Sequence, residues 1–201
     1  MPVIDINGRR LLYIHVPKVG GTSVTEFLSR HGAVIFDESM TIYQKKFRPR
    51  HLHAEHLKQI YLPDMFDYVF MVVRNPVEKL VSEYRYQRRK SGLHWQTATN
   101  FQSWLRYSLW RSSNSPSYRE NHFRAQSEFA CFNCEIFKLE DGHGQLTKRL
   151  AEIAGILPAE TVDQLNKSPR KDYLISKQSI DIIHNRYSDD FNNFGYSMND
   201  G

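Results

Sequence analysis

One short stretch of the chain carries the residue types that bind phosphate groups. Residues 17–23 read Pro-Lys-Val-Gly-Gly-Thr-Ser and directly follow an apolar run. Backbone N–H groups at a helix N-terminus bind anions, and Lys18 would add a positive charge beside them. The two glycines let the backbone approach a bound group, and the two hydroxyls can cap a helix or donate to phosphate oxygens. The stretch predicts a phosphate loop, and a strand–turn–helix corner with a solvated lysine is the alternative.

A second stretch places charge at the end of another apolar run. Arg74 follows residues 66–73, the strongest strand pattern in the chain, and Pro76 comes two residues later. Proline is tolerated in the first turn of a helix, because its missing N–H would have no intrahelical partner there. In open parallel sheets, ligands bind at the carboxyl ends of strands, where Arg74 would lie. Ser82 would follow about two turns into the helix. The stretch therefore predicts a second strand–loop–helix unit with charge at its junction.

The elements that would position these residues alternate between strands and helices, which indicates an α/β fold. The run at 11–17 is too continuously apolar for a half-exposed strand, so it predicts a buried parallel strand with helices on both sheet faces. Residues 37–50 show no period and predict a loop. The predicted strands are 11–17, 33–36, 66–73 and 135–140, and the predicted helices are 21–31, 54–61, 76–84, 95–109, 119–129, 145–154 and 176–194.

The loop does not match the usual nucleotide-triphosphate motif, because its lysine precedes its glycines. The order P-K-x-G-G-T-S instead resembles the 5′-phosphosulfate loop of sulfotransferases, which use 3′-phosphoadenosine 5′-phosphosulfate (PAPS). The residues around this motif resemble those of the carbohydrate sulfotransferases, the group that includes heparan sulfate 2-O-sulfotransferase. Residues 74–84 resemble that family's 3′-phosphate motif, and residues 187–196 resemble its C-terminal motif. The resemblance spans about residues 11–197 and implies a single domain over 1–201. It also implies a P-loop-NTPase-like fold with a central parallel sheet flanked by helices.

The resemblance assigns roles to individual residues. Lysine stands at position 79, where the family more often has arginine, so a direct phosphate role for Lys79 stays open. Gln126 resembles a family glutamine and is expected to face the acceptor, as is the basic loop at 37–50 with Tyr43. The residues implied to bind the donor are Lys18, Gly20, Gly21, Thr22, Ser23, Arg74 and Ser82, with Lys167 and Arg170 in a late basic loop that would cover the nucleotide.

A histidine is expected to act as the base that accepts the acceptor's proton. Relatives of this type carry one shortly before the helix that precedes the central strand, and His51 matches that place best, with His53 second. Histidine suits the task because its unperturbed pKa lies near neutrality. Capping or surface histidines are the alternative reading. Metal binding is disfavoured, because no Asp or Cys at ligand spacing accompanies these side chains.

The implied reaction is transfer of a sulfuryl group from PAPS to a hydroxyl of a carbohydrate acceptor, leaving 3′-phosphoadenosine 5′-phosphate (PAP). The protein would position groups in line and stabilise charge, with Lys18 acting as the catalytic cation on the leaving phosphate and no metal required. A P-loop-like nucleotide kinase is one alternative. A nucleotide- or glycan-binding module that has lost catalysis is another. The acceptor's identity and the oligomeric state are left open.

The composition of the chain limits the class of protein and the cellular compartment that we expect. The 201 residues carry a formal charge of +5, with 24% charged and 40% hydrophobic residues, as in an ordinary globular protein. The sequence contains no apolar run of about 18 residues, so no transmembrane helix is predicted. Cys131 and Cys134 make no disulfide framework, so a reducing compartment is expected. The starting Met1 and the compact length favour a complete bacterial-type cytoplasmic protein, or a Golgi-lumen protein if an anchor was removed. No nucleic-acid module surrounds the basic residues.

Overall fold

The computed structural model describes residues 2–36, 40–42, 45–47, 49–90, 100–115, 117–156 and 175–197. The chain forms two compact units, one of Met1–Val73 with Glu128–Leu165 and the other of Arg74–Ser127 with Asn166–Gly201. Each unit therefore combines segments that are far apart in the sequence. Because one domain can contain two compact units, the single domain over 1–201 stays a prediction.

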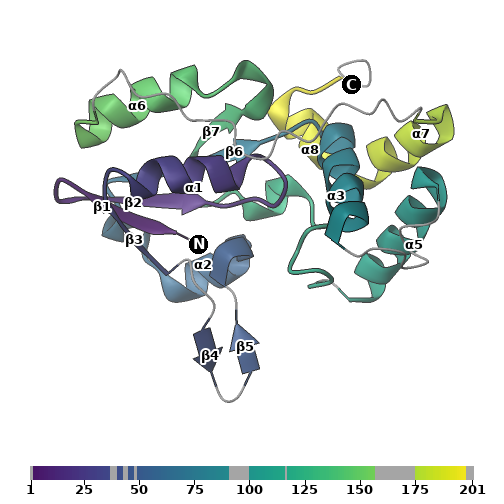
Figure 1. The fold of residues 1–201 in the computed structure, drawn as a ribbon, viewed down its shortest axis with the longest axis horizontal. Helices are drawn as coiled ribbons and strands as arrows, with labels where there is room; N and C mark the ends of the chain where they lie inside the picture. Colours follow the sequence, from purple (N-terminus) through teal and green to yellow (C-terminus); the bar gives the residue numbers. More distant parts are fainter. Residues whose placement is uncertain are drawn as a thin grey trace. The chain divides into compact units, whose positions relative to one another are not determined.

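The first unit contains a five-stranded sheet flanked by helices, which confirms the predicted α/β class (Figure 1). The strand order is β3-β1-β2-β6-β7. The central strand β6 pairs in parallel with β2 and β7, as expected, whereas β1 is antiparallel to both β2 and β3. The sheet is therefore mixed, with an antiparallel edge beside its parallel part. Its strands are β1 (Val3–Ile6), β2 (Arg9–Ile14), β3 (Ala33–Ile35), β6 (Tyr68–Val73) and β7 (Glu135–Lys138).

The register of the parallel strands brings their carboxyl ends to one edge of the sheet. Ile14 at the end of β2 pairs with Met71, and Val73 at the end of β6 pairs with Lys138. Every residue of β6 is buried, which explains why its sequence is apolar without alternation. The segments that follow β2 and β7 therefore start from the same edge.

The strand β1 was not predicted from the sequence. It forms a hairpin with β2 through Asn7 and Gly8, which have φ angles of 53° and 77°. Positive φ at both central residues defines a type I′ turn, which Asn-Gly favours strongly. The turn signal was present in the sequence, and the short strand before it was overlooked.

The helices of the first unit are α1 (Gly21–Ser29), α2 (Ala54–Ile60) and α6 (Gly144–Ala154). Short 3₁₀ helices occur at Pro49–His51, Pro63–Met65 and Leu139–Asp141. The loop predicted at 37–50 is wrong in part, because β4 (Met40–Ile42) and β5 (Lys45–Phe47) form an antiparallel pair there. Strands of three residues are too short for a period-2 pattern to reveal them.

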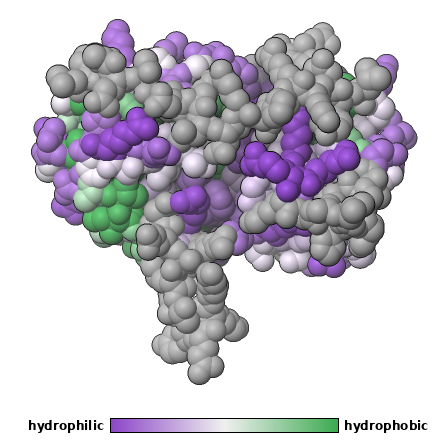
Figure 2. Space-filling view, in the orientation of Figure 1, coloured by the Kyte–Doolittle hydropathy of each residue, from purple (hydrophilic) through white to green (hydrophobic). Residues whose placement is uncertain are grey.

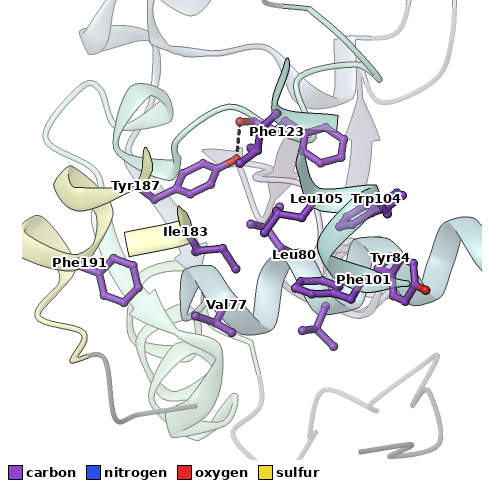
Figure 3. Packing of buried hydrophobic residues seen from close by; sticks show 12 residues of the cluster. Val77, Leu80, Tyr84, Phe101, Trp104, Leu105, Phe123, Ile183, Tyr187 and Phe191 are labelled. Carbon is purple, nitrogen blue, oxygen red and sulfur yellow. Dashed lines mark hydrogen bonds between the residues drawn. The ribbon is translucent and has the colours of Figure 1, made fainter. Parts of the chain in front are cut away.

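The second unit is a cluster of helices around an aromatic core (Figure 3). Trp104 and Leu105 are buried among the aromatic side chains, and the hydroxyl of Tyr187 donates a hydrogen bond of 2.8 Å to the carbonyl of Phe123. The helix predicted at 176–194 is divided at Tyr187, whose φ and ψ of −120° and 29° are not helical. The helices are α3 (Pro76–Lys90), α5 (Phe101–Asn114), α7 (Lys177–Arg186) and α8 (Ser188–Phe194).

The helix predicted at 119–129 is wrong. Arg119, Glu120 and Asn121 have φ angles of 49°, 55° and 67°, so the chain turns with left-handed residues there. A right-handed helix cannot continue through such residues. Only a short 3₁₀ helix, η3 (Gln126–Phe129), lies in the predicted span.

The two cysteines lie on either side of a tight turn that precedes β7. The N–H of Cys134 donates to the carbonyl of Cys131 at 3.1 Å, and both are thiols without a disulfide. Burial raises the pKa of Cys131 to about 12, because the thiolate loses its hydration. At neutral pH Cys131 is therefore a protonated, unreactive thiol.

The coloured surface in Figure 2 is mainly hydrophilic, with one hydrophobic patch on the face shown. Exposed large hydrophobic side chains come from several elements, namely Ile35, Ile60, Leu62, Met65, Trp110 and Ile136. Within the described parts of the chain, no helix is long and apolar enough to cross a membrane.

Candidate functional site

The predicted phosphate loop follows β2 in the first unit and begins α1. Gly20 caps the helix in the left-handed region with a φ of 80°, and no side chain supplies an acceptor at this cap. The N–H of Ser23 bonds to the Gly20 carbonyl at 3.0 Å, in a tight first turn. The helix therefore begins at a residue without a side-chain cap, as suits an anion site.

Both glycines of the loop are required by close neighbours. A Cβ on Gly21 would lie 1.8 Å from Nε2 of His15, and one on Gly20 would lie 3.1 Å from Cδ1 of Leu139. The φ of Gly20 also disfavours a side chain. The loop backbone thus packs directly against residues that follow β2 and β7.

Lys18 adopts a conformation that is rare for its residue type. Its φ is 68°, in the left-handed region, and its side chain is partly exposed. Such a conformation is disfavoured by about 1–2 kcal/mol for a residue with a Cβ. Strained residues of this kind concentrate at functional sites, where the surrounding structure holds them. Thr22 is exposed and Ser23 is buried on α1, immediately after the two glycines.

The structure connects the predicted base His51 to this loop through His15. The His15 ring is 4% exposed and lies against Gly21, and the His51 ring meets it edge-on at 4.9 Å between centroids. Nδ1 of His51 lies 2.9 Å from the backbone carbonyl oxygen of His15. A carbonyl oxygen can only accept, so this hydrogen bond requires a proton on Nδ1. In the neutral ring the lone pair then sits on Nε2.

His53 is placed differently. It is 5% exposed at the start of α2 and packs against the His56 ring at 4.2 Å between centroids. Its side chain accepts no capping hydrogen bond. His53 therefore packs against a residue of its own helix, whereas the His51 ring meets His15.

Two neighbours of the loop were missed by sequence reasoning. His15 ends the apolar run before the loop, and its place next to the motif was the available signal. His143 precedes α6, and its Cε1 would lie 4.0 Å from a Cβ on Gly20. No sequence signal connected His143 to a motif that lies more than a hundred residues earlier. Burial lowers the pKa of His143, so its ring is neutral at neutral pH.

The second predicted phosphate site lies in the second unit, where Arg74 and Asn75 precede α3. Oδ1 of Asn75 accepts from the N–H groups of Val77 at 2.9 Å and Glu78 at 3.4 Å, so Asn75 caps the helix. Pro76 occupies the first helical position, where it was expected. The Arg-Asn-Pro order therefore has a structural explanation at its second and third residues.

Arg74 is held at both its side chain and its backbone. Nη2 bonds to Oε2 of Glu78 at 2.9 Å, and the side chain remains 21% exposed. Ser82 lies one turn beyond Glu78 on α3 and is half-buried. Glu78 and Ser82 are spaced by four within α3, so they share one side of the helix, and Arg74 bonds to Glu78 from just before the helix. The Arg74 guanidinium therefore lies against the first turn of the helix side that carries Ser82.

Lys79 does not belong to that face. Its side chain is 2% exposed, and Nζ donates to the carbonyl of Arg124 at 2.9 Å. Nζ also lies 5.7 Å from the centre of the Tyr187 ring. The sequence left open whether Lys79 binds phosphate directly. The structure instead places Lys79 as a buried lysine that stabilises the interior of the second unit.

The expectation that Gln126 faces the acceptor is wrong. Its side chain is fully buried, Oε1 accepts from the N–H of Arg74 at 2.9 Å, and Nε2 donates to the Arg74 carbonyl at 2.7 Å. Both ends of the carboxamide are thus occupied by one residue. The predicted donor ligands Lys167 and Arg170, and Tyr43 of the predicted acceptor loop, lie outside the described residues.

A comparison with protein families gives one result for this chain. The model described as "Sulfotransferase family" matches residues 4–197. The chain belongs to the sulfotransferase family. The matched span includes the phosphate loop, both predicted histidines and the Arg74 segment. Searches of curated proteins and of solved structures found no match.

Family membership establishes sulfuryl transfer as the general chemistry of this protein. Among the residues that the structure describes, no three or more His, Cys, Asp or Glu side chains are grouped to hold a metal ion. Lys18 and Arg74 carry positive charge at the two predicted sites, and the N-terminus of α1 adds the positive end of its dipole at the first.

Proposed function

We propose that this sulfotransferase moves a sulfuryl group from PAPS to a hydroxyl of a carbohydrate acceptor. The observation that carries the proposal is the phosphate loop, whose helix begins at a left-handed glycine with no side-chain cap. Its backbone is held in place by close packing, since a Cβ on Gly20 or Gly21 would contact Leu139 or His15. The N–H groups at such a helix start suit a phosphate group.

Two groups of residues would bind the two ends of this donor. The N–H groups of Gly20, Gly21, Thr22 and Ser23 would hold the 5′-phosphate, with Lys18 beside them. Arg74, just before α3, and Ser82, within α3, would hold the 3′-phosphate. The donor supplies an activated sulfuryl group and a phosphate that leaves with negative charge. Lys18 would stabilise that charge, which grows on the leaving oxygen during transfer.

His51 is the base that we propose. Its Nδ1 must carry a proton to bond the His15 carbonyl, so Nε2 of the neutral ring carries the lone pair that can accept a proton. The carbonyl also fixes the ring's orientation, as the buried partner of a catalytic histidine commonly does. His51 would take the proton from the acceptor hydroxyl as the oxygen attacks sulfur.

A transfer assay tests the proposal and separates the two histidines. The protein is given PAPS with labelled sulfate and a panel of carbohydrate acceptors, and transferred label is counted. We expect His51→Ala to lower transfer by about 10²–10⁴-fold, the usual contribution of a general base, and to leave PAP binding unchanged. The matched control, His53→Ala, is expected to retain transfer. Equal activity of wild type and His51→Ala would contradict the assignment of the base.

The same assay distinguishes the competing functions. Transfer from ATP with Mg²⁺ in place of PAPS would indicate a kinase. Binding of PAP with no turnover over the whole acceptor panel would indicate a binding module that has lost catalysis. Transfer only to non-carbohydrate hydroxyls would keep the donor and replace the acceptor class.

A further inference from the structure

The backbone of Arg74 is hydrogen-bonded by a single side chain. The Gln126 carboxamide accepts from the Arg74 N–H at 2.9 Å and donates to the Arg74 carbonyl at 2.7 Å. The orientation of the amide is unambiguous, because an N–H needs the oxygen and a carbonyl needs the nitrogen. The pair of bonds imitates the pairing of an antiparallel strand. Both backbone groups of this residue are thereby satisfied, although it belongs to neither a strand nor a helix.

Gln126 is in turn held by Asp190 of α8. The Asp190 carboxylate is fully buried and accepts from the N–H of Gln126 at Oδ2 and from the N–H of Ser127 at Oδ1, each at 2.8 Å. Both oxygens thus bond the first N–H groups of the 3₁₀ helix η3. Hydrogen bonds to an ionised acceptor are the stronger ones, and their burial excludes competing water.

The segment that carries Gln126 is fixed at further points. The Tyr187 hydroxyl donates to the Phe123 carbonyl at 2.8 Å, and the buried Lys79 donates to the Arg124 carbonyl at 2.9 Å. Side chains from α3, α8 and the junction of α7 with α8 therefore hold residues 123–127. Gln126 projects from this fixed segment to Arg74, which makes it a rigid support.

We propose that Gln126 and Asp190 are positioning residues for the 3′-phosphate subsite and act through Arg74. The inference rests on the proposed function, in which Arg74 binds the donor's 3′-phosphate. The Glu78 carboxylate orients the guanidinium, at 2.9 Å from Nη2, and Gln126 fixes the Cα from which that side chain extends. An arginine whose two ends are fixed before binding loses less entropy when it captures a phosphate.

Binding of two nucleotides tests this inference by calorimetry. PAP carries the 3′-phosphate and adenosine 5′-phosphate lacks it, so the ratio of their dissociation constants isolates the subsite. We expect wild type to prefer PAP strongly and Arg74→Ala to lose most of that preference. Gln126→Ala is expected to reduce the ratio by about tenfold, with unchanged binding of adenosine 5′-phosphate. Gln178→Ala, the same change at an exposed site on α7, is the control.

A double variant separates positioning from general damage. If Gln126 acts through Arg74, adding Gln126→Ala to Arg74→Ala should change the ratio no further. Asp190→Asn, which keeps one carbonyl acceptor, should reduce the ratio in the same direction and by less. Thermal unfolding and circular dichroism of each variant check that the second unit stays folded. A misfolded variant would weaken both nucleotides together, which a subsite effect does not.

The outcomes are distinguishable. A reduced ratio in Gln126→Ala, absent in the Arg74→Ala background, supports the inference. An unchanged ratio, or equal weakening of both nucleotides, overturns it while leaving the proposed donor in place. A wild type that does not prefer PAP overturns the proposed function, and the inference falls with it.

Discussion

Two helices of this chain, each directly after a strand, begin with opposite kinds of N-terminal cap. Where β2 leads into α1, the cap is Gly20, which has no side chain to accept from the helix N–H groups. Where β6 leads into α3, Oδ1 of Asn75 accepts from the N–H groups of Val77 and Glu78. The first helix thus begins without a side-chain cap, whereas the second is capped by its own chain.

The difference decides which atoms can bind an anion at each junction. At the first, the proposed binding groups are backbone N–H groups, so the side chains would matter mainly because glycine has none. At the second, Asn75 occupies two helix N–H groups, and in the proposed function the side chains of Arg74 and Ser82 would bind instead. A glycine-rich loop and an Arg-Asn-Pro sequence therefore predict different kinds of phosphate contact, although both lie between a strand and a helix.

Replacing Lys18 should produce the largest effect and sharpen the contrast, since it removes a charged side chain from the site that is built mainly of backbone groups. We expect Lys18→Gly to lower kcat for sulfuryl transfer by about 10²–10³-fold, as loss of one charge-stabilising donor does elsewhere. The unfolding temperature should not fall, because glycine tolerates the φ of 68° better than lysine. Steady-state assays and thermal unfolding measure the two quantities.

The control for this variant is Lys177→Ala, at an exposed position on α7. It should change neither quantity. If Lys18→Gly kept full kcat, the lysine would be a solvated corner residue.

Adding one methyl group to the first junction should have the next largest effect. In Gly21→Ala the new Cβ would lie 1.8 Å from Nε2 of His15, so the His15 ring or the loop must move. We expect a loss of about 1–3 kcal/mol in the free energy of unfolding, as for other overpacked sites. Urea titration followed by circular dichroism measures it.

Gly144→Ala is the matched change, because a Cβ there meets nothing within 4 Å. It should be neutral or slightly stabilising. Equal stability of both variants would break the claim that the loop backbone is enclosed.

Removing the cap of the second junction should have the smallest effect. Asn75→Ala takes away the acceptor for two helix N–H groups and should cost about 1 kcal/mol of stability, the usual value for a cap. Thr22→Ala in the first turn of α1 should cost much less, because no side chain caps that helix. Thermal unfolding compares them. Equal losses would mean that the two junctions are capped alike.

Local signals explain how much of this architecture the sequence could predict. The apolar runs of β2 and β6 predicted buried strands, and the residues after them predicted the two junctions. The Asn7-Gly8 turn was as clear a signal as either run and predicts a hairpin, yet β1 was missed. The prediction of a helix at 119–129 was wrong, because residues with left-handed backbone conformation interrupt a sequence whose residue pattern is typical of a helix.

The parts of the site that could not be predicted depend on contacts between distant residues. Gln126 bonds Arg74 across 52 residues, and Asp190 bonds Gln126 across 64. A helical or strand period carries no information about such partners, because they are set by how elements pack. The same holds for His143 beside Gly20. Of the late basic loop, Lys167 and Arg170 stay predictions.

The long reach of these hydrogen bonds bears on how the protein is made. A chain leaves the ribosome from its N-terminus, so Arg74 emerges well before Gln126 and Asp190. During that interval the Arg74 backbone lacks its native partner Gln126, and the Asp190 carboxylate that holds Gln126 comes nearly last. The second unit can therefore complete its hydrogen bonding only near the end of synthesis, whereas the β1–β2 hairpin and the start of α1 need only the first thirty or so residues. Nascent chains stopped before residue 190 should be more easily cleaved by protease around Arg74 than full-length chains.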